Sequence, residues 1–231
     1  MPKTIFLVGG NSGIGLATAE LLQSQGHSLL AASRSTNNLA ALDIPTQNFE
    51  ATDITKLFLP ESLDGLIYFP GTINLKPFHR LTTEDFLNDF QINCLAAAQV
   101  IQQALPSLKN SPAASIVLFS TIAVAQGMAF HASISAAKAA VEGLARSLAA
   151  EFAPRIRVNV IAPSLTDTPL ASKLLGNDER KQAAAHRHPL QQVGIAGDVA
   201  QIAAFLLSDS SSFITGQIIR PDGGLSSIRI F

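Results

Sequence analysis

Short apolar runs alternate along the chain with longer stretches in which apolar residues recur at helical spacing. The short runs are typical of buried β-strands, and the longer stretches are typical of helices packed on a core. Their alternation indicates an α/β fold: a doubly wound parallel sheet of Rossmann type with helices on both faces, in three αβα layers. The expected strands cover residues 5–8, 28–32, 66–69, 115–119, 157–161 and 217–219, with a weaker one at 47–51, and the expected helices cover residues 14–25, 83–105, 132–152 and 198–207.

No internal repeat, low-complexity tract or linker divides these elements, so we expect one Rossmann-type domain that covers residues 1–231. Residues 165–194 stand apart, because they contain few strand signals and many polar and basic side chains. They follow a predicted strand end, which is where α/β folds place ligand sites. Two interpretations are open for this segment: a mobile lid over a substrate, or a plain surface excursion.

Composition narrows the classes of function. Hydrophobic residues make up 47% of the chain and charged residues only 14%, which fits a sheet buried on both faces. The net charge is −1 and no run of Lys and Arg occurs, so neither nucleic acid nor an anionic membrane is an expected partner. The apolar runs are too short for a signal-peptide core or a membrane span, which predicts a soluble cytoplasmic protein. Because Cys94 is the only cysteine, we expect neither an internal disulfide nor a metal site.

A cluster of glycines directly follows the first predicted strand and precedes the first predicted helix. Glycine allows a tight turn there and lets backbone N–H groups approach a pyrophosphate at the positive end of the helix. The alternative is a glycine-rich turn without a ligand, but the place between strand and helix is the one that a dinucleotide site requires. The predicted cofactor contacts of this loop are Gly9, Asn11, Ser12, Gly13, Ile14 and Gly15.

The end of the second predicted strand indicates which dinucleotide is preferred. An NAD site presents a carboxylate to the ribose hydroxyls at this point, yet no Asp or Glu occurs between Glu20 and Asp43. The strand ends instead in Ser33, Arg34 and Ser35, and a guanidinium flanked by hydroxyls can bind a 2′-phosphate. A solvated arginine would explain Arg34 but not the missing carboxylate, so we expect NADP(H) to be preferred over NAD(H).

Together with motifs further along, these features resemble the short-chain dehydrogenase/reductase family over nearly the whole chain. The glycine loop matches the family's GxxxGxG pattern, and residues 134–141 are similar to the helix that carries its Tyr-xxx-Lys motif. Residues 157–163 are similar to the strand and loop that clasp the nicotinamide carboxamide. Beyond the glycine loop and residues 33–35, the resemblance implies cofactor contacts from Asp53, Ile54, Phe69, Gly71, Lys138, Pro163, Thr166 and Thr168.

The same resemblance implies a catalytic set in which one member is replaced. In the family, a tyrosine one helical turn before the lysine donates a proton, a serine orients the substrate oxygen, and an asparagine holds a water relay. The positions that match tyrosine, lysine, serine and asparagine are Ile134, Lys138, Thr121 and Asn93. Isoleucine can neither give nor take a proton. The only tyrosine of the chain, Tyr68, ends the fourth predicted strand, so no shift of the alignment supplies the donor.

Three functions are compatible with such a site. The first is an NADP(H)-dependent oxidoreductase that acts on a small carbonyl or alcohol substrate, or on an activated C=C bond, with a substitute proton donor. His131 is the best candidate for that donor, because imidazole titrates near neutrality, and Ser133, Ser135, Thr121 or Lys138 acting through water are others. The alternative is a non-catalytic NADP(H)-binding sensor or partner subunit, in which Lys138 still holds the nicotinamide ribose. A different reaction on the same scaffold, such as dehydration or epimerisation, is the third.

The predicted helix at 132–152 is rich in alanine and glycine, so another helix can approach it closely. Members of the family often pair this helix across a two-fold axis, and the resemblance therefore implies a homodimer or homotetramer. A helix buried within its own chain is the alternative. The other expected partner is a small-molecule substrate, which the sequence does not name.

Overall fold

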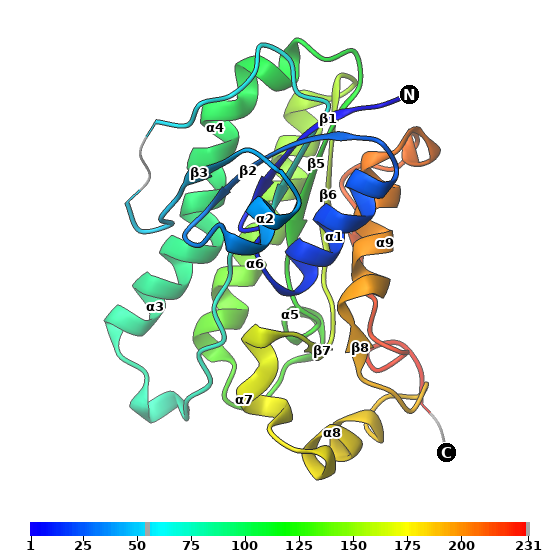
Figure 1. Ribbon diagram of the computed structural model, residues 1–231. Helices are drawn as coiled ribbons and strands as arrows, with labels where there is room; N and C mark the ends of the chain where they lie inside the picture. Colours follow the sequence, from blue (N-terminus) through cyan, green and yellow to red (C-terminus); the bar gives the residue numbers. More distant parts are fainter. Residues whose placement is uncertain (54–55, 230–231) are drawn as a thin grey trace.

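The computed structural model describes residues 1–53 and 56–229, and a seven-stranded parallel sheet forms the centre of this described part (Figure 1). The strand order is β3-β2-β1-β4-β5-β6-β9, so the direction in which strands are added reverses after β3. Such a reversal opens a crevice beyond the carboxyl ends of β1 and β4, where α/β folds bind ligands. The doubly wound fold predicted from the sequence is confirmed. The strands are β1 (Thr4–Val8), β2 (Ser28–Ser33), β3 (Thr46–Asn48), β4 (Gly65–Tyr68), β5 (Ala114–Phe119), β6 (Ile156–Ile161) and β9 (Ile218–Ile219).

Two hydrophobic cores lie against opposite faces of the sheet. In β1, Ile5 and Leu7 belong to one core, whereas Phe6 and Val8 belong to the other. Both faces are therefore covered, which explains why the strand is an unbroken apolar run. None of the helices in the described part of the chain is both long and apolar enough to span a bilayer. One face carries α1 (Gly13–Ser24), α2 (Asn37–Ala41) and α9 (Ala196–Leu207), and the other carries α3 (Thr83–Phe90), α4 (Ala96–Lys109) and α6 (Ala132–Phe152) (Figure 1).

The helix predicted over residues 83–105 is interrupted by a single π-helical turn at Gln91–Leu95, which separates α3 from α4. A π turn widens the helix by one residue and changes which side chains face inward, and such turns occur often at functional sites. Asn93 lies inside it. Most other predicted boundaries lie within a residue or two of the observed ones, and the weak strand at 47–51 is the shorter β3.

Residues 165–194 contain short elements that the sequence pattern did not predict. These elements share a small cluster of buried residues separate from the two cores: Ala171, Leu175, Ala184 and Val193. Figure 1 shows α7 and α8, in yellow, beyond the carboxyl ends of the strands. The segment consists of β7 (Thr166–Asp167), α7 (Ser172–Leu175), α8 (Asp178–Ala185) and β8 (Gly194–Ile195), with a 3₁₀ turn at Pro169–Ala171, and α5 (Ala123–Gln126) lies at the same end of the sheet.

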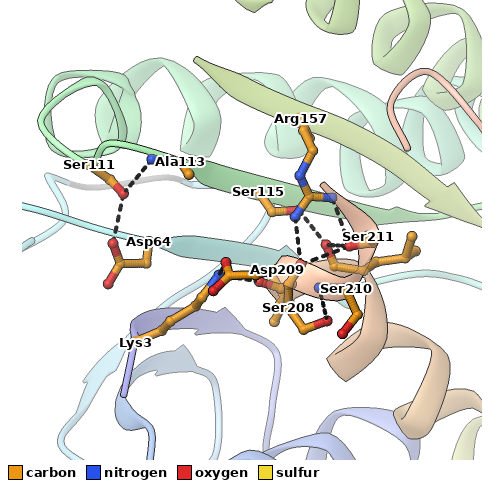
Figure 2. A network of polar contacts seen from close by, with 12 residues as sticks. Lys3, Asp64, Ser111, Ala113, Ser115, Arg157, Ser208, Asp209, Ser210 and Ser211 are labelled. Carbon is orange, nitrogen blue, oxygen red and sulfur yellow. Dashed lines mark hydrogen bonds and ion pairs between the residues drawn. The ribbon is translucent and has the colours of Figure 1, made fainter. Parts of the chain in front are cut away.

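A network of polar contacts closes the opposite, amino end of the sheet (Figure 2). The Arg157 guanidinium of β6 donates to Ser211 Oγ at 2.9 Å and to the Ser208 carbonyl at 3.2 Å. Lys3 Nζ, just before β1, forms an ion pair with Asp209 at 2.6 Å. These contacts attach the segment after α9 to the starts of two strands that lie on different sides of β4.

Candidate active site

A cleft of about 710 Å³ lies at the carboxyl ends of the strands. Its wall is built from the glycine loop after β1, the ends of β2, β4 and β5, the start of α6 and the segment after β6. Sequence-predicted residues from six separate stretches of the chain therefore meet around one space. Those that line the cleft are Gly9, Asn11, Ser12, Gly13, Ile14, Gly15, Ser33, Arg34, Ser35, Phe69, Gly71, Thr121, His131, Lys138, Pro163, Thr166 and Thr168.

The glycine loop turns so tightly that side chains would not fit. A Cβ on Gly15 would lie 2.9 Å from both the Gly10 Cα and the Gly9 carbonyl oxygen. Gly9 and Gly13 have φ angles of +80° and +53°, in the left-handed region that favours glycine. The α1 helix begins here, and its N-cap residue Ser12 makes no side-chain capping bond. The Ser12 side chain therefore does not cap the first N–H groups of α1, which lie beside the cleft. Such N–H groups can donate hydrogen bonds to an anion bound there.

Asn11 has a supporting role that the sequence did not reveal. Its Oδ1 accepts the backbone N–H groups of Asn38 and Leu39 at 3.0 and 3.1 Å, and its Nδ2 donates to Ser35 Oγ at 2.9 Å. These bonds fix the turn between β2 and α2. Arg34 projects from that turn, exposed, into the outer end of the cleft. The side chain of Asn11 therefore holds the turn that presents Arg34.

Asp53 and Ile54, two of the predicted cofactor contacts, are placed differently from the others. Asp53 is exposed in a turn in which its N–H donates to the Glu50 carbonyl at 3.1 Å, and it is not among the described residues that line the cleft. Ile54 lies outside the described residues. Glu50 and Ala51, which the sequence did not single out, line the cleft instead. The contact predicted for Asp53 is not tested by this arrangement and stays a prediction.

Lys138 is almost fully buried, on the first turns of α6, and its Nζ donates to the Phe119 carbonyl at 2.9 Å. Burial lowers the pKa of Lys138 to about 8, although Asp89 and Cys94 act in the opposite direction. The carbonyl uses one N–H group of the Lys138 ammonium. The other N–H groups can donate hydrogen bonds to the hydroxyls of a ligand bound in the cleft.

Asn93 approaches the same point from the π turn. Its Nδ2 donates to Thr72 Oγ1 at 2.9 Å and to the Asp89 carbonyl at 2.7 Å. Its Oδ1 is buried and, among the described residues, has no hydrogen-bond partner. A Cβ on Gly71 would lie 3.1 Å from Asn93 Oδ1 and 3.3 Å from Lys138 Nζ, so the glycine leaves the space between the two groups open.

Asp89 is a buried carboxylate that the sequence reasoning missed. It is fully buried and accepts hydrogen bonds from Thr72 Oγ1 at 2.5 Å and from Ser133 Oγ at 2.7 Å. Its spacing of four residues before Asn93 on one helix face was the available signal. Because Ser133 directly precedes Ile134, Asp89 anchors the start of α6 beside the cleft.

The candidate proton-transfer positions are occupied as follows. Ile134 is 4% exposed and contributes to the cleft wall. His131 precedes α6, and its Nδ1 donates to the Ala129 carbonyl at 2.7 Å, so Nε2 is the ring atom left to face a ligand. Tyr68 is excluded as a donor to the cleft, because its hydroxyl donates to the Ile92 carbonyl at 2.6 Å inside the core and burial raises its pKa. Thr121 is half-buried in the wall.

Two contacts tie the segment 165–194 to the site. A Cβ on Gly13 would lie 3.2 Å from Thr168 Cβ, so Thr168, directly after β7, packs against the glycine loop. Ser164 Oγ lies 2.8 Å from His188 Nε2, and both residues line the cleft. Neither Ser164 nor His188 was singled out from the sequence. Within the described residues, no group of three or more His, Cys, Asp or Glu side chains is arranged to hold a metal ion.

Comparison with known proteins gives a consistent picture. The family model described as enoyl-(acyl carrier protein) reductase matches residues 8–226. A tropinone reductase homologue of Arabidopsis thaliana is 34% identical over 239 residues, which cover 95% of this chain and 91% of the relative. The 3-oxoacyl-(acyl-carrier-protein) reductase of Thermotoga maritima is 30% identical over 241 residues, with 96% and 97% covered.

Solved structures agree in fold. A short-chain dehydrogenase/reductase of Brucella melitensis superposes with a TM-score of 0.87 at 29% identity, and 96% of each chain is covered. ElxO, as a Tyr-to-Phe variant with NADPH bound, superposes with a TM-score of 0.88 at 26% identity, covering 99% of this chain and all of the other.

Proposed function

Because the chain belongs to the short-chain dehydrogenase/reductase family, we propose that it is an NADP(H)-dependent oxidoreductase of small molecules. The observation that carries this proposal is the cleft in which the glycine loop, Lys138 and Arg34 face one space. The substrate class is a carbonyl or alcohol, or an activated C=C bond. Relatives whose names specify tropinone, 3-oxoacyl and enoyl groups support that range.

The residues present fit a dinucleotide. The glycine loop leaves a cradle that any Cβ would fill, and the start of α1 offers N–H groups to a pyrophosphate. Lys138 would donate to ribose hydroxyls, and Pro163, Thr166 and Thr168 would hold the nicotinamide end. When bound, the coenzyme supplies or accepts a hydride.

The preference for NADP(H) rests on Arg34. Its exposed guanidinium stands between Ser33 and Ser35 at the outer end of the cleft, where a 2′-phosphate can accept paired hydrogen bonds. ElxO, a structural neighbour, holds NADP and NADPH. We expect Arg34→Ala to weaken NADPH binding by about 10- to 100-fold and to leave NADH binding unchanged. Calorimetry with both coenzymes checks this, with the exposed Arg155→Ala as control; equal losses for both would contradict the assignment.

The chemical half of the proposal concerns the proton. Ile134 takes the place at which the family resemblance implies a tyrosine, and a buried isoleucine cannot exchange protons. Thr121 retains a hydroxyl that can orient a substrate oxygen, and Asn93 and Lys138 retain the polar groups behind it. The proton must therefore come from another group of the wall, for which His131 is the sequence-based candidate.

The burial of Ile134 also favours a second candidate function. A cleft that binds NADP(H) but lacks a proton donor would serve as a sensor, or as the silent subunit of a complex. In that case Lys138 keeps its place because it holds ribose hydroxyls, a role that does not need a tyrosine.

One experiment separates the two functions. The protein is titrated with NADPH, and NADPH oxidation is then followed with tropinone and acetoacetyl-CoA, alongside the Ile134→Tyr variant. Turnover by the natural sequence supports the oxidoreductase. Tight binding without turnover, together with turnover that appears only in Ile134→Tyr, would leave the non-catalytic function for these substrates.

A homodimer or homotetramer formed through α6 remains part of the proposal. Ala136, Ala139 and Gly143 are exposed along that helix, and a Cβ on Gly143 would meet no atom within 4 Å. Small exposed side chains allow a second helix to approach. Sedimentation of the natural protein and of Gly143→Trp tests this, since the larger side chain should dissociate the assembly. The cytoplasmic location expected from composition also stays a prediction.

A further inference from the structure

A serine and a histidine form a polarised pair in the wall of the cleft. Ser164 Oγ lies 2.8 Å from His188 Nε2, and the histidine is 3% exposed. His188 Nδ1 lies 2.8 Å from the Ala184 carbonyl, which can only accept. The ring proton of the neutral histidine is therefore on Nδ1, and Nε2 accepts the proton of the Ser164 hydroxyl. A hydroxyl bonded to an imidazole that a third group orients is the arrangement that activates serine in enzymes.

The pair stands next to the residues that would surround a reacting substrate. Ser164 follows Pro163, whose carbonyl accepts the N–H of Ile122 at 3.3 Å. Ile122 in turn follows Thr121. This backbone bond places Ser164 and Thr121 on neighbouring, paired stretches of chain, and all four residues line the cleft.

The imidazole is held from three sides. Ala184 belongs to α8, and Ser164 precedes β7. The C-terminal loop packs on the ring, since a Cβ on Gly223 would lie 3.5 Å from His188 Cδ2. Asp222, on that loop, is the charged group that interacts with the ring. Burial raises the pKa of Asp222, but hydrogen bonds from Ser226 and Gly224 and the charge of His188 lower it overall.

We propose that Ser164 and His188 form the proton relay of this cleft, with Ser164 Oγ in contact with the substrate oxygen and His188 acting through it. The proposal rests on the oxidoreductase function proposed above and names the group that replaces tyrosine. The buried, oriented ring of His188 sets this pair apart from the half-exposed His131.

The relay balances in both directions. In reduction, the carbonyl carbon would accept the hydride that the coenzyme supplies when bound, and the π electrons of C=O would move to oxygen. That oxygen takes the proton of Ser164 Oγ, and Ser164 takes the Nε2 proton of the His188 imidazolium. In alcohol oxidation, the alcohol proton passes to Ser164 Oγ while the Ser164 proton passes to His188 Nε2. The Nδ1 proton stays on Nδ1, hydrogen-bonded to the Ala184 carbonyl, throughout, so the neutral pair seen here is the proton-accepting state.

Kinetics of four variants test the relay. Ser164→Ala and His188→Gln should each lower kcat for NADPH-dependent reduction of tropinone or acetoacetyl-CoA by about 100-fold or more, because a positioned acid contributes that much. His186→Ala is the matched control, since His186 is exposed on the same segment and its ring bonds with the Gln191 side chain. Ser164→Thr should restore part of the loss. NADPH affinity should be unchanged in Ser164→Ala.

The pH profile supplies a readout that a structural role would not move. The relay gives up the Nε2 proton in reduction and takes one up there in oxidation, so kcat for reduction should fall as pH rises and kcat for oxidation should show the opposite slope. Ser164→Ala should remove both slopes. Asp222 is the carboxylate that would shift them, and Asp222→Asn should move both to lower pH.

A second readout does not involve the coenzyme. Nitrogen NMR of the histidine rings in the protein alone should show His188 as the Nδ1–H form, with only its Nε2 resonance changed in Ser164→Ala. An Nε2–H form of His188 would overturn the relay. So would turnover by the natural sequence that Ser164→Ala leaves intact or that His131→Ala abolishes. In these turnover outcomes the oxidoreductase function stands. NADPH binding without turnover of any probe would overturn both proposals.

Discussion

At the amino end of the central sheet, charged side chains bind one another and nearby carbonyls, whereas at the carboxyl end polar groups face a cleft. Arg157 at the amino end donates to Ser211 Oγ and to the Ser208 carbonyl (Figure 2). It also donates to the Ile214 carbonyl. At the carboxyl end, Asn93 Oδ1 is buried among the described residues without a partner, and a buried Lys138 bonds with one carbonyl. The first arrangement satisfies its polar groups internally, and the second leaves bonding capacity for a ligand. Substitutions at the amino end should therefore affect stability, and those at the carboxyl end should affect binding.

The largest effect is expected in the glycine loop. In Gly15→Ala, the added Cβ would lie 2.9 Å from backbone atoms that cannot swing away, so the loop must open and its N–H groups move. We expect NADPH affinity to fall by about 100-fold or more, since several charge-assisted hydrogen bonds are displaced together. Fluorescence titration with NADPH measures the loss.

Gly143→Ala is the matched control, because a Cβ at Gly143 meets nothing within 4 Å. Alanine in a helix interior should raise the free energy of unfolding by up to about 1 kcal/mol and leave NADPH affinity unchanged. A loss of affinity of equal size in both variants would show that the cleft is not where the coenzyme binds.

The next largest effect is expected at the amino end. Arg157→Ala removes three charge-assisted hydrogen bonds, to Ser211 Oγ and to the Ser208 and Ile214 carbonyls, and should lower the free energy of unfolding by about 2–4 kcal/mol. The two carbonyls keep weaker, neutral donors in Ser211 Oγ and Asn159 Nδ2. NADPH affinity of the folded fraction should be unchanged. Urea unfolding measures the first quantity and calorimetry the second. The exposed Arg155→Ala is the control, with an expected change below about 0.5 kcal/mol.

A smaller effect is expected from the charge of Lys138. Its pKa of about 8 means that the ammonium is lost as pH rises through that value. NADPH affinity should therefore weaken by about tenfold between pH 7 and pH 9.5, because a charge-assisted hydrogen bond to the ribose is lost. In Lys138→Met the affinity should be weak at both pH values, and an affinity of the natural protein that does not change with pH would contradict the ribose contact.

The same group has the opposite effect on stability without coenzyme. Between pH 8 and the ordinary lysine value of 10.5, the unfolded chain binds a proton that the folded chain does not. The free energy of unfolding should thus rise with pH through this window in the natural protein, and Lys138→Met should lack this rise. With rising pH, NADPH affinity should fall while the free energy of unfolding rises. This pair of opposite pH dependences is expected of a buried lysine that binds the ligand.

The smallest effect is expected at Asp209. Its ion pair with Lys3 is short, but the aspartate side chain is 73% exposed, and solvent screens such pairs. Asp209→Ala should cost less than about 1 kcal/mol of unfolding free energy, and high salt should reduce the difference further. A loss as large as that of Arg157→Ala would mean that the network acts as one cooperative unit.

The comparison of the two ends also explains what the sequence could predict. Strands such as β1 and β5 are buried on both faces, so their apolar runs and their order were readable. The glycine loop was readable because its backbone demands are local. Lys138 and Thr121 were found through the resemblance to a family rather than through physical necessity. The features that could be predicted thus depend either on residues adjacent in sequence or on a motif shared with the family.

The features that were missed depend on contacts between distant parts of the chain. The five-residue helix α2 has weak helical periodicity of its own, and Asn11, far away in sequence, binds its first N–H groups. Ser164 and His188 are 24 residues apart and meet only because α8 folds back over the end of β6. Asp89 on a partly polar helix resembles a surface residue until Thr72 and Ser133 are seen to surround it.

The separate cluster under residues 165–194 has a consequence for how the molecule opens. Four buried side chains, of Ala171, Leu175, Ala184 and Val193, hold the segment together, whereas the sheet is flanked by two much larger cores. Backbone amides of α7 and α8 should then exchange with solvent deuterium through a local event that does not require the sheet to unfold. Since His188 and Thr168 belong to this segment, each such event would separate the imidazole from Ser164 and release the glycine loop, giving a ligand a way in and out.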